Sequence, residues 1–94
     1  MKILAIEKEL DSTNSMIQNE IFQEEAKHVY ELYQKEIIRE IYFTDTKNAI
    51  LILECKDKYE AKSILNEFPL VKTGMIDFNM LELHSYTGYS RLFK

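Results

Sequence analysis

Two carboxylates and a phenol occupy positions from which they can share one side of a sheet. Glu40 and Tyr42 are two residues apart in an alternating segment, and Glu54 is in step with Ile50 and Ile52 in the next apolar segment. Residues two apart in a strand point to the same face. If the two faces coincide, these groups meet in a partly apolar space, where burial raises a carboxyl pKa toward the range useful for proton transfer. One carboxylate would then take a proton from carbon, while a neutral acid or phenol stabilises the enolate oxygen.

Other polar residues extend this candidate site. His84 ends the last apolar segment, where an imidazole titrates near neutral pH, and Tyr86 follows two residues later. Arg39 and Arg91 can each bind a substrate carboxylate through two parallel hydrogen bonds. The predicted catalytic residues are therefore Glu40, Tyr42, Glu54 and His84, and the predicted substrate-binding residues are Arg39, Tyr86 and Arg91. Under the alternative interpretation, Arg39, Glu40 and Glu54 form only exposed cross-strand ion pairs worth roughly 0 to 1 kcal/mol.

The residues that usually bind metals and cofactors are scarce. The chain has two histidines, His28 and His84, far apart in sequence, and a single cysteine, Cys55. This spacing predicts no metal site and no intrachain disulfide. Cys55 follows an apolar run and is expected in the core, and His28 is expected at the surface because it lies off the main apolar stripe. No glycine-rich phosphate loop is present, so we expect no nucleotide or flavin cofactor.

Composition limits the classes of partner. The 94 residues suit one domain, residues 1–94, and 46% hydrophobic with 30% charged residues is typical of a globular chain. The net charge of −4 argues against a nucleic-acid partner, because phosphate binding needs clustered Lys and Arg. No apolar run approaches the roughly 18 residues that span a bilayer. Charged residues interrupt the first ten positions, unlike a signal peptide, so we expect a cytoplasmic protein that binds no membrane.

The first half of the chain predicts a strand followed by a helix. The apolar run within Lys2–Lys8 is typical of a strand buried on both faces, and the polar segment Asp11–Ser15 would end it. Steps of four, three and four residues predict a helix over Asn19–Lys35, which can begin as early as Ser15. The expected buried stripe of this helix consists of Phe22, Ala26, Val29 and Tyr33.

The middle of the chain predicts a hairpin. Ile37–Thr44 alternates and is rich in β-branched and aromatic residues, and Ala49–Cys55 is an apolar run. The polar turn Asp45–Asn48 that joins them is short, which favours an antiparallel pair.

The last third predicts a helix, a strand and a tail. A helix begins at Asp57 with Glu60 as its capping partner and ends at Pro69. The last strand covers Met75–Leu83, and His84–Lys94 forms a tail. The order strand, helix, strand, strand, helix, strand predicts an α+β, ferredoxin-like βαββαβ fold, with a four-stranded antiparallel sheet and two helices on one face.

Both faces of this sheet carry apolar residues. Ile50 and Ile52 point opposite to Leu51 and Leu53, whereas a face exposed to water would show clean alternation. Two helices cover one face only, so we expect two subunits to pack sheet against sheet and enclose a barrel-like space. The aromatic tail, residues 84–94, could then contact the partner subunit; alternatively it folds back on its own subunit.

Several segments together resemble a known family. They are Phe68–Val71, Gly74–Phe78, Leu83, the tyrosine-containing tail, Glu25–Tyr33, Arg39–Phe43 and the apolar strand that ends at Glu54. The first four resemble the C-terminal half of the muconolactone isomerase-like family. The other three resemble uncharacterised members of the same dimeric α+β barrel superfamily. The tail departs from the polar, basic tail of the isomerases, and no catalytic motif of theirs maps onto this chain residue by residue. The resemblance therefore assigns no catalytic residue.

The resemblance implies a homodimer or higher homo-oligomer with a small-molecule pocket between sheet and helices. Combined with the candidate residues, it predicts an isomerase or another cofactor-independent acid–base enzyme that acts on a small organic acid or lactone. The alternatives are a non-catalytic binding or assembly protein and a cofactor-free oxygenase on the same barrel.

Overall fold

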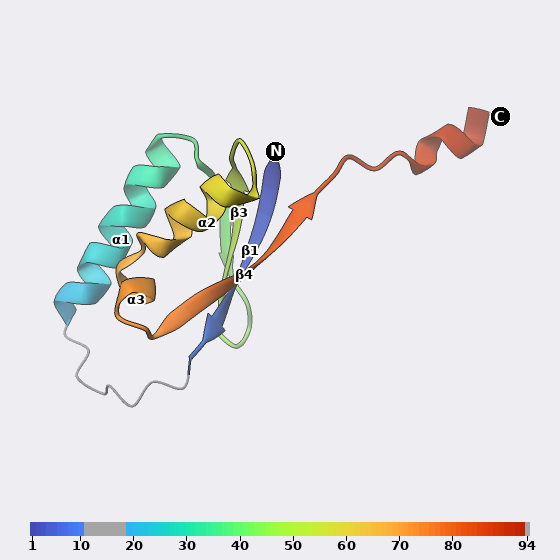
Figure 1. The fold of residues 1–94 in the computed structure, drawn as a ribbon. Coiled ribbons are helices and arrows are strands. Elements are labelled where there is room, and N and C mark those ends of the chain that lie inside the picture. Colours follow the sequence, from blue (N-terminus) through green and yellow to red (C-terminus); the bar gives the residue numbers. More distant parts are fainter. Residues whose placement is uncertain (11–18, 94) are drawn as a thin grey trace.

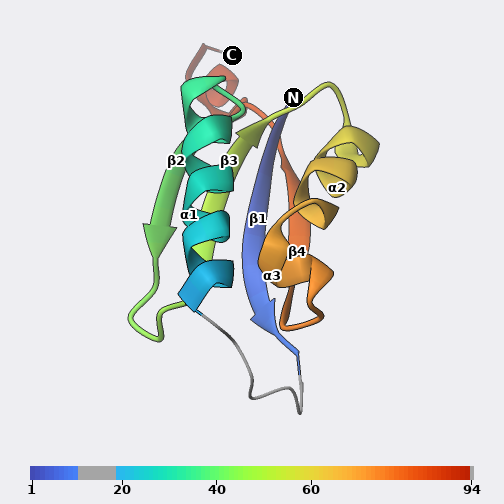
Figure 2. The same cartoon turned by 90° about the vertical axis from the view of Figure 1, so that its left-hand side faces the viewer.

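The sheet and its helices form two layers. A computed structural model describes residues 1–10 and 19–93 and contains a four-stranded antiparallel sheet in the order β2-β3-β1-β4. The helices lie on one face of the sheet (Figures 1 and 2). This arrangement confirms the predicted α+β, ferredoxin-like fold. The elements in chain order are β1 (Lys2–Glu9), α1 (Asn19–Gln34), β2 (Ile38–Phe43), β3 (Ala49–Glu54), α2 (Lys58–Asn66), α3 (Pro69–Lys72), β4 (Ile76–Leu83) and the 3-10 turn η1 (Gly88–Phe93).

Most predicted boundaries agree within one or two residues. The predicted turn at Asp11–Ser15 and the possible early start of the first helix at Ser15 lie outside the described residues. The short helix α3 was not predicted. It begins at Pro69, because proline lacks the amide hydrogen that a continuing helix needs but is well suited to the first position of a new one.

The core lies between the sheet and the helices. On this side β1 pairs with β3 through Ile3 and Leu53 and through Ala5 and Leu51, and all four side chains are buried. The largest fully buried side chains are Phe68, Ile3, Ile38, Leu51, Leu53 and Leu65. Alternate residues of β1 and β3 face the helices, and the residues between them form an apolar outer face. The two sequences are therefore almost continuously apolar.

The end of α1 sets the start of β2. The amide of Ile37 donates to the carbonyl of Leu32 over 3.0 Å, and the amide of Glu36 donates to the carbonyl of Tyr33 over 3.0 Å. This pair of bonds is the Schellman motif, which normally has glycine at the residue in the left-handed conformation. Here that residue is Glu36, with φ of 64°. The carbonyl of Ile37 then accepts from the amide of Glu54 over 2.8 Å and joins the chain to the sheet.

The buried side of α1 differs from the prediction. Phe22 and Tyr33, expected in the core, are 50% and 55% exposed. The side that packs inward is formed by Ile21, Glu25, His28 and Leu32, with Val29 half-buried as expected. The predicted apolar side is therefore displaced by one residue along the helix from the side that packs inward. The inward side contains the polar residues Glu25 and His28, so its apolar pattern is weaker in the sequence.

The capping of α2 agrees with the prediction. Asp57 Oδ1 accepts a hydrogen bond from the amide of Glu60 over 2.8 Å, and Glu60 Oε1 accepts from the amide of Lys56 over 3.2 Å. These bonds satisfy backbone donors that the first turn of a helix leaves unpaired.

The sheet face opposite the helices carries a patch of aliphatic side chains that no described element covers. The strand register places on this outer face Leu4, Ile6, Ile50, Ile52, Leu81 and Leu83. The tail leaves the end of β4 and projects away from its own sheet (Figure 1). Its large apolar side chains, Tyr86, Tyr89, Leu92 and Phe93, are all exposed, so the tail does not fold back on its own subunit.

Replacing Glu36 with glycine should stabilise the chain. A left-handed conformation costs an ordinary residue about 1–2 kcal/mol, whereas glycine loses only about 0.5–1 kcal/mol through its more flexible unfolded state. We expect a gain of about 0.5–1 kcal/mol in the free energy of urea unfolding. The matched control is Gly74→Ala, at φ of 79°, which should destabilise. A loss of stability in Glu36→Gly would contradict the assignment of strain to this position.

Candidate functional site

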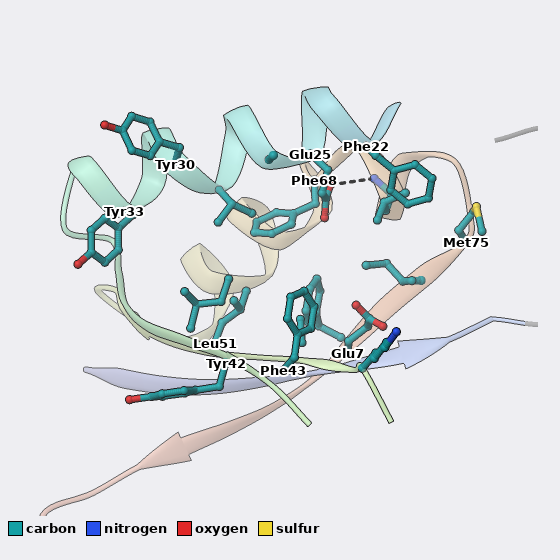
Figure 3. Close-up of a pocket in the computed structure, with 18 of the residues that line it drawn as sticks. Glu7, Phe22, Glu25, Tyr30, Tyr33, Tyr42, Phe43, Leu51, Phe68 and Met75 are labelled. Atoms are coloured by element: carbon teal, nitrogen blue, oxygen red, sulfur yellow. Dashed lines mark hydrogen bonds between the residues drawn. The ribbon is translucent and has the colours of Figure 1, made fainter. Parts of the chain in front are cut away.

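An open cleft of about 1170 Å³ separates α1 from the helix-facing side of the sheet (Figure 3). Aromatic and aliphatic side chains make up most of its walls. Phe22, Tyr30 and Tyr33 contribute from α1, and Phe43 contributes from β2. The floor contains Leu51 of β3 and Phe78 of β4, both buried in the sheet surface.

Two attachments of α1 border the cleft. In the first half of the helix, Glu25 Oε1 accepts a hydrogen bond from the amide of Leu70 in α3 over 3.1 Å. At its end, the Schellman bonds connect it to β2. Between these two attachments the wall of the cleft includes the small side chain of Ala26, which leaves space that a larger residue would occupy.

Two carboxylates point into the cleft from opposite walls (Figure 3). Glu7 extends from β1, where it lies opposite Phe78, and its Oε2 accepts a hydrogen bond from Asn48 Nδ2 over 3.4 Å. Glu25 extends from α1 and is half-buried. Burial raises the pKa of Glu25, the negative charge of Glu7 raises it further, and the bond from Leu70 partly opposes this change.

This pair suits proton transfer. A carboxyl group with a raised pKa holds its proton more readily near neutral pH, and a second carboxylate nearby remains able to accept one. The arrangement therefore places two carboxyl groups with different surroundings on the walls of the same cleft.

Glu40, Tyr42 and Glu54, which the sequence predicted to share one face of β2 and β3, do share a face. That face is the outer one, opposite the helices. Tyr42 lies opposite Ile50, and its hydroxyl donates to Glu40 Oε1 over 2.8 Å, which raises the pKa of the phenol. Both side chains are exposed, and both also touch the rim of the cleft. Glu54 Oε2 lies 3.2 Å from the terminal ammonium of Met1 and forms an ion pair with it.

The remaining predicted residues are divided between the cleft and the tail. Arg39 lines the cleft. His84, Tyr86 and Arg91 follow β4 and do not line the cleft of their own chain. His84 Nε2 lies 3.7 Å from Glu82 Oε2, and the ring of Tyr86 packs edge-on against Tyr89 at 4.8 Å.

The sequence reasoning missed Glu7, Glu25 and His28. Each carried a signal: Glu7 is in step with Ile3 and Ala5 on the buried side of its strand, and Glu25 and His28 fit a helical stripe with Leu32. A polar residue in register with buried apolar residues is the pattern that would have identified them.

The expectation that His28 lies at the surface was wrong. Its ring packs edge-on against Phe68 at 4.8 Å between centroids. Its Nε2 is buried and has no hydrogen-bond partner among the described residues, and burial lowers the pKa of the imidazole, which favours the neutral form. Cys55 is buried as expected, and burial raises the pKa of its thiol.

Residues 1–10 and 19–93 contain no cluster of three or more His, Cys, Asp or Glu side chains that could hold a metal ion. No helix in the same part of the chain is both long and apolar enough to cross a membrane.

The sheet order and the helices on one face define a ferredoxin-like α+β subunit with a cleft beneath α1. Neither a family model nor a curated protein matches the sequence. A solved structure that matches is the 5-chloro-2-hydroxyhydroquinone dehydrochlorinase of Burkholderia phenoliruptrix AC1100 in complex with 2,5-dihydroxybenzoquinone. The TM-score is 0.65 at 19% identity, over 94% of this chain and 98% of that chain. At this identity the likeness shows the fold alone, and both the superfamily and the muconolactone isomerase-like family stay predictions.

Glu25→Gln should increase stability at neutral pH and have little effect in acid. The pKa of Glu25 is higher in the folded chain than its usual value of 4.5, so folding favours the protonated form. The contribution of this group is complete below pH 4.5 and is lost as pH rises through the folded pKa. Glutamine keeps an oxygen for the Leu70 amide and carries no charge. Urea unfolding between pH 4 and 8 measures the difference, with Glu24→Gln on the exposed side of α1 as control; an equal gain at every pH would contradict this account.

Proposed function

We propose that the chain binds a small unsaturated or aromatic-derived compound in the cleft and moves a proton on it by cofactor-independent acid–base catalysis. The observation that carries the proposal is the pair Glu7 and Glu25, which extend into the cleft from opposite walls. The volume suffices for a small ligand, because pockets for such molecules typically measure about 300–1,000 Å³.

The shape and lining of the cleft favour a flat ligand. Rings from α1 and β2, among them Phe22, Tyr33 and Phe43, offer surfaces on which an unsaturated ring can stack. The dehydrochlorinase with a similar fold was solved with 2,5-dihydroxybenzoquinone, a flat oxygenated ring. An unsaturated lactone has a carbonyl oxygen that activates the C–H bonds of a saturated carbon conjugated with it. The ring C–H bonds of the quinone are vinylic, so the quinone is a probe of binding.

The two carboxyls would have different roles. The carboxylate of Glu7 takes a proton from carbon next to the carbonyl, and the electron pair of the broken C–H bond moves into the enolate. Protonated Glu25 donates a hydrogen bond to the enolate oxygen. The proton held by Glu7 then returns at another carbon, which shifts the double bond and leaves both carboxyls as they began.

The assembly belongs to the same proposal. We infer that two copies pack through the outer face of the sheet, because its aliphatic side chains would otherwise remain in water. The tail of each copy then reaches the partner, which would explain why His84, Tyr86 and Arg91 lie far from the cleft of their own chain. In that dimer the outer-face residues Glu40, Tyr42 and Glu54 lie at or near the seam.

The catalytic roles predict a clear ranking of variants. We expect 2,5-dihydroxybenzoquinone or muconolactone to raise the melting temperature of the wild type, because a ligand that binds only the folded state stabilises it. Glu25→Gln and Glu7→Gln should each slow the exchange of muconolactone C–H for deuterium by roughly 10²-fold to 10⁴-fold, while binding persists. Proton NMR follows the exchange. Glu24→Gln is the matched control.

Two outcomes would change the assignment. Full exchange in both cleft variants, with loss in Glu40→Gln or Tyr42→Phe, would assign the chemistry to the residues first predicted from the sequence. Stabilisation by ligand without exchange in any form of the protein would make the cleft a non-catalytic binding site.

Leu81→Glu should convert the dimer to a monomer. Leu81 is on the outer face and is 54% exposed in the single chain, so a charge there is tolerated by the subunit but not by a dry interface. Sedimentation velocity measures the mass of both forms. Tyr59→Glu, on exposed α2, is the control and should stay dimeric. A wild-type chain that sediments as a monomer at high concentration would refute the proposed assembly.

A further inference from the structure

The only register shift in the pairing of the described strands falls on one residue, Arg39. Ile38 lies opposite Leu53 and Glu40 lies opposite Ile52, so Arg39 is an extra residue with no partner on β3. A bulge of this kind redirects the side chains around it and is frequent beside binding sites. It allows both Ile38 and Ile41 to face the helices, although an uninterrupted strand would turn them to opposite sides.

The redirected arginine lies where two hollows meet. Arg39, Tyr30 and Tyr33 line the main cleft and also line a smaller hollow of about 370 Å³ beside the C-terminal end of α1. The smaller hollow is completed by Gln34, Glu36 and Ile38. Two phenol hydroxyls and a guanidinium therefore belong to one end of the cleft, and all three groups donate hydrogen bonds.

The guanidinium is available to a ligand. Carboxylates are close in sequence, but Arg39 forms no ion pair with any residue that the structure describes. Glu40 accepts a hydrogen bond from Tyr42 instead. Glu36 shares the smaller hollow and lowers the positive potential there without pairing directly.

The cleft has chemically different ends. Leu53 pairs with Ile38 on one side and with Ile3 on the other, so the Arg39 end of the cleft lies level with Ile3. Glu7 is four residues further along β1, roughly 13 Å away at about 3.3 Å per residue. Lys47, in the turn before β3, lines the cleft and precedes Asn48, the residue that bonds Glu7. One end thus combines a carboxylate pair with a lysine, and the other presents an unpaired arginine between tyrosines.

We propose that Arg39 binds a carboxylate group of the ligand and that the ligands of this cleft are therefore small aromatic or dienoic carboxylates. The planar guanidinium meets a carboxylate through two parallel hydrogen bonds, which fixes both position and orientation. The ligand then lies along the cleft with its carboxylate at Arg39 and its reacting carbon toward Glu7 and Glu25. This inference rests on the proposed function, since it names the substrate class of the same site.

Matched ligands with and without charge test the proposal. 4-Hydroxybenzoate and 4-hydroxybenzamide have similar shapes but differ in charge, and hydroquinone lacks the group altogether; calorimetric titration measures the Kd of each. The wild type should prefer the acid to the amide. Arg39→Gln should weaken binding of the acid by roughly 10-fold to 100-fold, the usual size of a hydrogen bond to a charged group, and should change the amide and hydroquinone by less than about twofold.

The chain offers two matched control variants. Lys47→Gln removes the other cation of the cleft, and Lys27→Gln removes an exposed cation of α1 that does not line it. Both should keep the preference for the acid. Arg39→Lys keeps the charge but not the two-pronged geometry, so it should recover only part of the lost affinity. Arg39 is exposed, and an unchanged circular dichroism spectrum will show that its variants fold.

The outcomes separate this inference from the proposed function. Equal binding of acid and amide by the wild type, an equal loss of both ligands in Arg39→Gln, or transfer of the effect to Lys47→Gln would each overturn the role of Arg39. Binding of hydroquinone without binding of the acid would overturn this inference alone and leave the cleft as a site for neutral rings. Failure of all three ligands and of 2,5-dihydroxybenzoquinone to bind would overturn both.

Discussion

The attachment of α1 to the rest of the subunit is the constraint on which the cleft depends. Glu25 accepts a hydrogen bond from the amide of Leu70 in α3, and the Schellman motif joins the C-terminal end of α1 to β2. Glu25 also lines the cleft, so this attachment places a half-buried carboxyl group there. Burial raises the pKa of this carboxyl, and the bond from Leu70 partly opposes the rise.

A second constraint comes from the proportions of the layers. Helices on one side of a four-stranded sheet leave the other side open, and here that side carries six aliphatic residues. Cleft and outer face are on opposite sides of the same strands, so alternate residues serve different purposes. Glu7 points toward α1, while its neighbours Ile6 and Lys8 belong to the opposite face.

Much of the fold was predictable because it depends on short-range patterns. The β-branched and aromatic residues of β2, the capping pair of Asp57 and Glu60, and the stop at Pro69 all had the structural effect that their chemistry predicts. The alternation predicted for β2 is broken by the bulge at Arg39. The candidate site was less predictable. The faces of Glu40 and Tyr42 were correctly paired, but only the sheet order shows that this face points away from the helices.

The missed residues share a physical cause. Glu25 and His28 occupy the inward side of α1, where sequence reasoning looks for apolar residues and passes over polar ones. The burial of Glu25 depends on a backbone amide 45 positions later in the chain, a contact that no local pattern encodes. The bulge at Arg39 is likewise visible only from the pairing of two strands, because the sequence of β2 alternates without interruption.

The distribution of tyrosines gives the protein an unusual optical character. The chain has no tryptophan, and all six tyrosine side chains are more than half exposed in the single subunit. Unfolding one subunit would change their surroundings little, so near-ultraviolet absorbance and tyrosine emission are poor reporters of denaturation. The same signals would respond to a ligand in the cleft near Tyr30 and Tyr33, or to burial of Tyr86 and Tyr89 against another copy. Tyrosine absorbance and emission therefore report ligand binding and association better than they report unfolding.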